Sequence, residues 1–141
     1  IIAQLNNLLS TYHVFYLNVR GYHWNVKGEH FFTLHPKFEE LYTSLQLQID
    51  EIAERILTLG GTPLHAYSDF TQHTSISEDK NVKDGTSCVK GVVTGLQALI
   101  AEQRQVSALA EESEDQGSAD LIDAYVQEQE KLVWMYNAFL G

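Results

Sequence analysis

Hydrophobic residues recur at three- and four-residue steps along most of the chain, which is the periodicity of helices with one buried face. The first such segment runs from about Ile2 to Val26, and residues 25–30, which include Gly28, indicate the turn that ends it. Its expected buried positions are Leu5, Leu8, Leu9, Tyr12, Phe15, Tyr16 and Val19. The pattern therefore predicts a long helix at the start of the chain.

A second helical segment carries two seams. It is predicted to begin near Thr33 as its cap, with Pro36 in the first turn, and to end at residues 60–63, which read Gly-Gly-Thr-Pro. One seam alternates four- and three-residue steps, as in the core of a helix bundle, through Phe38, Tyr42, Leu45, Ile49, Ile52, Ile56 and Leu59. The other seam sets two acids between two leucines, which is unusual for a solvated face: Leu47, Asp50, Glu54 and Leu57.

Two further helices are predicted after a long connection. They cover about Ser87–Glu112 and Ser118–Leu140, and the short acidic link between them makes them antiparallel neighbours. The connection, residues 64–85, is polar, with one short helix expected around Leu64–Phe70. A connection of this length suits a crossover between parallel helices. The fold class predicted from these elements is all-α, a four-helix bundle with a short extra helix in the crossover.

Composition and charge narrow the function classes. A chain of 141 residues suits a single domain covering residues 1–141, and its net charge of −10 repels phosphate backbones and attracts cations. We therefore expect DNA binding only through a basic segment outside this sequence, which begins at Ile1 rather than at a methionine. The single cysteine, Cys88, allows no internal disulfide and favours the reducing cytoplasm. No apolar run is long enough to span a membrane.

Two histidines and two acids are spaced in a way that one chain cannot close into one metal site. Asp50 and Glu54 are four residues apart, so they share a helix face about 6 Å apart along the axis. His35 precedes Asp50 by 15 residues of the same helix, or roughly 22 Å. If His23, His35 and the acids bind one ion, they must come from two copies of the chain. Two antiparallel copies of this helix about a two-fold axis near Thr43 would create two equivalent sites.

Each of these residues also has an ordinary structural interpretation. His23, beside Trp24, has the position of a helix-capping or packed residue. His35 is one turn before Glu39, the spacing of a local side-chain pair, and the two acids are also compatible with a solvated helix face. Together, however, histidines and carboxylates suit iron, manganese or zinc better than calcium or copper. A thiolate zinc site is excluded, and the chain has no Glu-x-x-His motif of the usual intrachain di-iron bundle.

Longer motifs resemble one known family. The stretches NVRGYHWNVKGEHFFTLHPKFEELYTSL, QIDEIAERILTLGG and EKLVWMYNAFLG are similar to those of the Dps family, the starvation-induced DNA-binding proteins or mini-ferritins. The most specific part is His-Trp, a histidine 12 residues later, and Asp-x-x-x-Glu 15 residues beyond it. The resemblance covers essentially the whole chain. It implies a ferritin-like four-helix subunit and a hollow shell of twelve subunits.

The resemblance also implies roles for the candidate residues. His23 and His35 of one subunit would share a ferroxidase centre with Asp50 and Glu54 of its partner. Glu39 matches an auxiliary, second-metal carboxylate, where the family often has an aspartate. Trp24 resembles a tryptophan beside the centre that intercepts oxidising equivalents, while packing at the interface is an equally good account of it. Asp115, Asp120 and Asp123 resemble an acidic three-fold pore, although acids are also common at helix N-termini.

The implied activity is oxidation of Fe(II), typically with hydrogen peroxide and with oxygen as the alternative oxidant, followed by storage of ferric mineral inside the shell, which protects against oxidative damage. Two other hypotheses remain open. One is a nucleoid-binding structural protein with incidental iron chemistry, although no lysine- or arginine-rich tail is visible here. The other is a helical oligomer whose polar interface residues only specify pairing.

Overall fold

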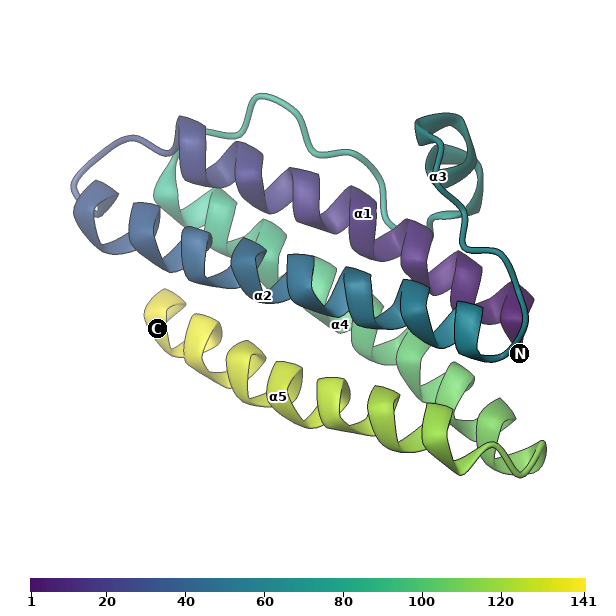
Figure 1. Cartoon of the computed structure of the whole chain (residues 1–141). Helices are drawn as coiled ribbons and strands as arrows, with labels where there is room; N and C mark the ends of the chain where they lie inside the picture. The colour runs from purple at the N-terminus through teal and green to yellow at the C-terminus, as the bar shows by residue number, and fades with distance from the viewer.

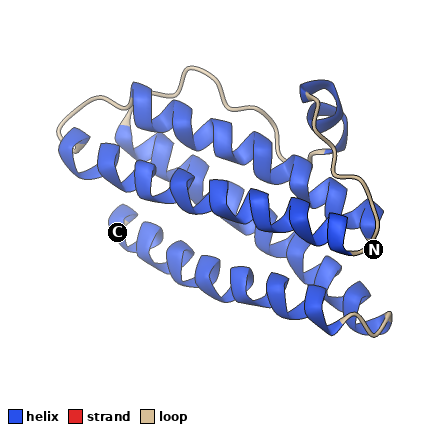
Figure 2. Cartoon of the chain, viewed as in Figure 1, coloured by secondary structure: helices blue, strands red, loops and turns tan.

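Four long helices lie side by side, and a fifth, short helix packs outside them (Figure 1). The computed structural model describes all 141 residues, as helices α1 (Ile2–Asn25), α2 (Phe31–Thr58), α3 (Tyr67–His73), α4 (Gly85–Glu112) and α5 (Gln116–Leu140). There is no β-strand, only an isolated bridge between Lys27 and Asp84 (Figure 2). The all-α prediction, with a short helix in the crossover between α2 and α4, is confirmed. None of the helices combines the length and apolar character needed to cross a membrane.

Several helix ends differ from the predicted ones. The helix α2 begins at Phe31, not near Thr33, and His30 precedes it without a side-chain cap. Pro36 therefore lies inside the helix rather than in its first turn. A proline there removes one backbone donor, which is least costly close to a helix start. Two helices begin earlier than predicted because aspartates cap them. Asp84 accepts from Ser87 N at 2.9 Å, and Asp115 accepts from Ser118 N at 3.1 Å.

The short helix also lies later than predicted, at Tyr67–His73 rather than around Leu64–Phe70. The backbone before it is tied to α1, where the Leu64 N–H donates to Asn6 Oδ1 at 2.9 Å. Ala66, which precedes the helix, is also extended, with φ −123° and ψ 141°. Phe70 then anchors the helix, since its ring is buried and stacks on His13 with the centroids 4.0 Å apart.

The first seam of α2 enters the bundle core as predicted. Its residues Phe38, Leu45, Ile52 and Ile56 are at most 1% exposed. They belong to one cluster of 24 buried residues that spans the four long helices. Tyr42, Ile49 and Leu59 lie at its border, half-buried. The other seam of the same helix is not covered by the chain itself, so α2 presents a second face outward.

The long crossover runs along α1 (Figure 2), and hydrogen bonds from three α1 side chains fasten it there. Asn18 of α1 is 8% exposed; its amide donates to Ser77 O at 3.0 Å and its carbonyl accepts from Asp79 N at 3.0 Å. Asn6 makes the same pair of bonds where the crossover begins. The Thr11 hydroxyl, between them on α1, accepts from the backbone N–H of Ser75 in the crossover at 3.0 Å. The crossover is therefore held along the outside of α1, away from the outer face of α2.

We predict that Asn18→Ala loosens the crossover locally. The substitution leaves a backbone N–H and a carbonyl without partners, which costs about 1–2 kcal/mol and should speed amide hydrogen exchange around Asp79 about 5- to 30-fold. Asn25→Ala is the control, because the exposed Asn25 amide bonds only within its own helix, to Gly21 O. Equal exchange rates in the two variants would show that the Asn18 bonds do not hold the crossover.

Candidate metal centre

His23 and His35 meet at one end of the α1–α2 pair. Their rings stack with centroids 3.8 Å apart and planes inclined by 11°. The Nδ1 of His23 lies 2.6 Å from the carbonyl oxygen of His35. In return, the Nδ1 of His35 lies 2.7 Å from the carbonyl oxygen of His23. A carbonyl oxygen only accepts, so both Nδ1 atoms donate. In the tautomer that these bonds select, each ring has its lone pair on Nε2, the atom that a metal ion would use.

Glu39 joins this pair through His23. Its Oε1 is 3.6 Å from His23 Nε2. The predicted local pair between His35 and Glu39 is wrong, because the His35 ring is stacked between His23 and Phe31, whose centroid is 4.9 Å away. Two ligands that each lie about 2.1 Å from one ion are about 3–4 Å apart, so Glu39 and His23 are spaced as two ligands of one metal. Of the five predicted ligands, His23 thus lies next to both His35 and Glu39.

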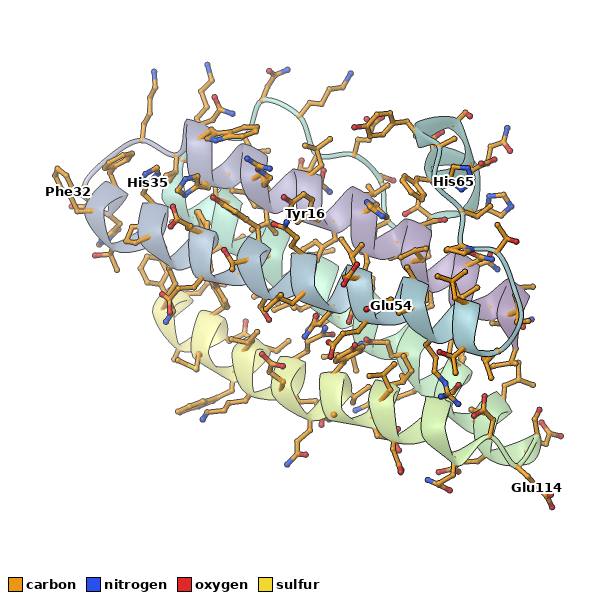
Figure 3. All side chains as sticks on the ribbon, viewed as in Figure 1. Tyr16, Phe32, His35, Glu54, His65 and Glu114 are labelled. Atoms are coloured by element: carbon orange, nitrogen blue, oxygen red, sulfur yellow. The ribbon has the colours of Figure 1, made fainter.

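Asp50 and Glu54 are not brought to the histidines within one chain. Both are exposed, and Figure 3 shows Glu54 far along α2 from His35. Over the whole chain, no three His, Cys, Asp or Glu side chains gather closely enough to hold a metal ion. The chain therefore carries the two halves of the predicted ligand set at separate levels of α2. That they meet between two copies stays a prediction.

The outward face of the α1–α2 pair is unusually apolar for a surface. Leu17 and Trp24 of α1 are 54% and 57% exposed, and Leu47 and Leu57 of α2 are 64% and 58% exposed. Burying one leucine side chain is worth about 1.5–3 kcal/mol, so a face that leaves several exposed is a candidate for contact with another protein surface. Asp50 and Glu54 lie between the two leucines of α2.

Arg20 lies on this face within a group of aromatic rings, which the sequence interpretation missed. Its Cζ is 4.7 Å from the centroid of Trp24 and 5.0 Å from that of Tyr42, and its Nη1 donates to Tyr16 Oη at 2.9 Å. Tyr42 also contacts His23 edge-on, with the centroids 5.3 Å apart. The spacing of residues 16, 20 and 24, four apart on one helix face, is the signal that was available in the sequence.

The centre of the bundle holds buried polar side chains that carry no charge. Each long helix contributes one uncharged side chain: Tyr12, Gln48, Gln103 and Gln129. Tyr12 Oη donates to Gln103 Oε1 at 2.5 Å, Gln103 Nε2 donates to Gln129 Oε1 at 2.8 Å, and Gln129 Nε2 donates back to Tyr12 Oη at 2.8 Å. Burial raises the pKa of Tyr12, so its hydroxyl stays protonated. This closed ring offers no anionic ligand where intrachain di-iron bundles place their carboxylates.

The three aspartates near the α4–α5 junction differ in their surroundings. Asp115 is half-buried and pairs with Arg55 Nη2 at 2.8 Å. Its hydrogen bonds with Ser118, together with Arg55, hold the pKa of its carboxyl below the usual range. Asp120 and Asp123 are exposed and accept from Gln116 and Ser107, each at 2.6 Å. The charge of Asp115 is therefore used within the chain, whereas the other two remain at the surface.

Cys88, the single cysteine, is a core residue. It is completely buried, and burial raises the pKa of its thiol to about 11. Its Sγ lies 3.8 Å from the carbonyl oxygen of Val82. The thiol is therefore protonated at neutral pH and takes no part in the candidate centre.

Comparison with known proteins supports the same family throughout the chain. The model of the ferritin-like domain family matches residues 2–141. A crystal structure of a Dps protein from Vibrio cholerae O1, described as a member of a broad superfamily of ferritin-like diiron-carboxylate proteins, has a TM-score of 0.97 and 52% identity; the match covers 99% of this chain and 89% of that one. A Dps protein from Bacillus brevis has a TM-score of 0.96 and 38% identity, covering 99% and 95%.

A similar result comes from a sequence relative. The DNA protection during starvation protein of Porphyromonas gingivalis is 38% identical to this chain over 99% of its length and 87% of the relative's. The chain spans most of each of these proteins, so the likeness is one of whole subunits and not of an isolated motif. Fold, length and sequence together show that this chain belongs to the Dps family of ferritin-like proteins.

Proposed function

We propose that the protein oxidises Fe(II), with hydrogen peroxide as the oxidant, and stores the ferric product inside a shell of twelve subunits. It thereby protects the cytoplasm from oxidative damage. The observation that carries the proposal is the reciprocal bonding of His23 and His35, which leaves both Nε2 atoms available beside Glu39. His35 and Glu39 lie on α2, the helix that also carries the exposed Asp50 and Glu54.

The dimer geometry follows from the helix arithmetic. Two copies of α2, antiparallel about a two-fold axis near Thr43, bring residue 35 of one helix opposite residue 51 of the other. That position lies between Asp50 and Glu54 of the partner. The same arrangement covers the exposed leucines of α2, so burial of apolar surface would favour the contact that completes the metal site.

The donor set suits the proposed reaction. Carboxylates favour Fe(III), imidazoles retain affinity for Fe(II), and a site with few protein ligands leaves room for the oxidant. Two Fe(II) ions supply the two electrons that reduce one hydrogen peroxide, with two protons, to two water molecules. Glu39 serves in this proposal as the carboxylate of a second iron. Paired electron delivery consumes peroxide without releasing hydroxyl radical.

Surface charge and Trp24 have supporting roles in the proposal. The net charge of −10 favours cation entry, and the exposed Asp120 and Asp123 are suited to line an entry pore, while Asp115 caps α5 beside it. Trp24 is exposed next to His23 and stacked on Arg20, so it is placed to donate an electron to an oxidising species at the centre and also to pack against the partner.

Replacing both histidines is predicted to abolish the activity. The double variant His23→Ala, His35→Ala removes the Nε2 ligands and should slow peroxide-dependent Fe(II) oxidation at least about a hundredfold, measured by stopped-flow absorbance. The control is His65→Ala, His73→Ala, which removes two exposed crossover histidines. Circular dichroism and sedimentation would establish that both variants fold and assemble. Oxidation at the control rate in a folded His23/His35 variant would contradict the site.

A second candidate function is DNA binding, which the names of the relatives suggest. The acidic body opposes it, so we predict no retardation of duplex DNA by this 141-residue chain in a mobility-shift assay at ~50 mM salt, where charge-driven binding is strongest. The comparison is the same chain with a lysine- and arginine-rich segment added ahead of Ile1. Salt-sensitive binding by the 141-residue chain itself would show that the charge argument is wrong.

A further inference from the structure

Arg20 has a buried hydrogen-bond donor that the chain does not use. Its Nε is the only buried side-chain nitrogen or oxygen of the protein without a hydrogen-bond partner. The other two arginines are paired, Arg55 with Asp115 and Arg104 with Glu130. A buried donor left unpaired costs about 1–3 kcal/mol, more for a charged group, so the guanidinium is incompletely satisfied within the chain. Its Nη2 also makes no hydrogen bond and is not buried, so this nitrogen is open to an acceptor from outside the chain.

The aromatic rings around Arg20 hold the guanidinium in place without satisfying that donor. Trp24, Tyr42 and Tyr16 surround its Cζ, with ring centroids at 4.7, 5.0 and 5.6 Å. Cation–π contacts orient the charge, and the single bond to Tyr16 uses Nη1. The group is therefore pre-organised on the outward face of the α1–α2 pair, and an ionised carboxylate is the acceptor that suits it best.

The proposed dimer supplies such a carboxylate. Arg20 lies one helical turn from His23 on α1, about 4.5 Å along the axis. It packs against Tyr42, so it faces residue 44 of the antiparallel partner helix. From there the partner's Asp50 is about 9 Å farther along, on the side of His23, and its side chain leans back toward Arg20, while the partner's Glu54 lies another turn beyond it. The partner's Glu51 is directed elsewhere, because the corresponding side chain accepts from Tyr125 Oη at 2.9 Å.

We propose that Arg20 of each subunit donates to the partner's Asp50 and so acts as a positioning residue for this metal-binding carboxylate. The inference rests on the proposed function, since it takes the same dimer. One carboxylate oxygen accepts from Arg20 and the other remains for iron. The aromatic group and the metal centre are then one interface, in which pairing of the subunits sets the orientation of Asp50 before iron arrives.

Charge exchange tests the pairing in iron-free protein. Arg20→Glu places two carboxylates together and should weaken subunit association about a hundredfold, measured by sedimentation over a concentration series. Asp50→Arg alone should do the same by opposing two guanidinium groups. The combination Arg20→Glu, Asp50→Arg restores an ion pair and should bring association back to within about tenfold of the original protein. Arg20→Lys, which keeps the charge, should be affected least.

The matched control is Arg20→Glu combined with Glu54→Arg, the same charge exchange one turn farther along α2, which should not restore association. Equal rescue by the two combinations, or no rescue by Arg20→Glu with Asp50→Arg, would overturn the pairing. Asp50→Arg keeps the test valid if Arg20→Glu fails to fold, because Asp50 is exposed. The readout is independent of iron, so oxidation that survives the histidine substitutions would count against the proposed function and not against this ion pair.

Discussion

The structure of the site depends on the paired hydrogen bonds that join His23 and His35 across the end of the α1–α2 hairpin. Each ring is fixed by the backbone of the other residue, with contacts of 2.6 and 2.7 Å. Neither ring can therefore turn without breaking a hydrogen bond between the two helices. The bonds assign the tautomer and point both lone pairs away from the backbone. They also set the register of α1 against α2, which determines where Arg20, Trp24 and Tyr42 meet.

A second constraint is the uncharged centre of the bundle. Tyr12, Gln103 and Gln129 satisfy one another in a closed ring, so the interior needs neither a metal nor a counter-charge. An isolated carboxylate there would carry a large desolvation cost. In our account, the acidic ligands are on the outer seam of α2, where they stay solvated in the single chain and acquire their partners on dimer formation. This explains why one helix carries an apolar seam inward and a mixed acidic and leucine seam outward.

Much of this arrangement could be predicted from the sequence. Regular apolar spacing indicated the four long helices, and the positions of Asp50 and Glu54 between Leu47 and Leu57 marked the second face of α2. The helix rise alone required two copies for the quartet. The tertiary contacts could not be predicted in the same way. Local spacing favoured a His35–Glu39 pair, but ring stacking between α1 and α2 directs Glu39 toward His23.

Other features depended on long-range hydrogen bonds. The short helix begins later than predicted, after an extended Ala66 and after Leu64, which binds Asn6, 58 residues away. The closed ring of hydrogen bonds in the bundle centre joins Tyr12 to Gln129, which are 117 residues apart. A tyrosine and a glutamine at that separation give no signal of contact in the sequence. Arg20 looks like an ordinary surface residue in the sequence, and only its surroundings show that one donor is buried and unused. Short-range periodicity thus predicts the elements, whereas the polar contacts between them require the structure.

The most direct test is a crystal structure of the assembled protein soaked in Fe(II) under anaerobic conditions, with iron located by anomalous scattering. We predict two equivalent iron centres per pair of subunits, each bound by His23 and His35 of one subunit and by Asp50 and Glu54 of its partner. Iron inside a single four-helix bundle, or an assembly in which the outward faces of α2 do not meet, would contradict it.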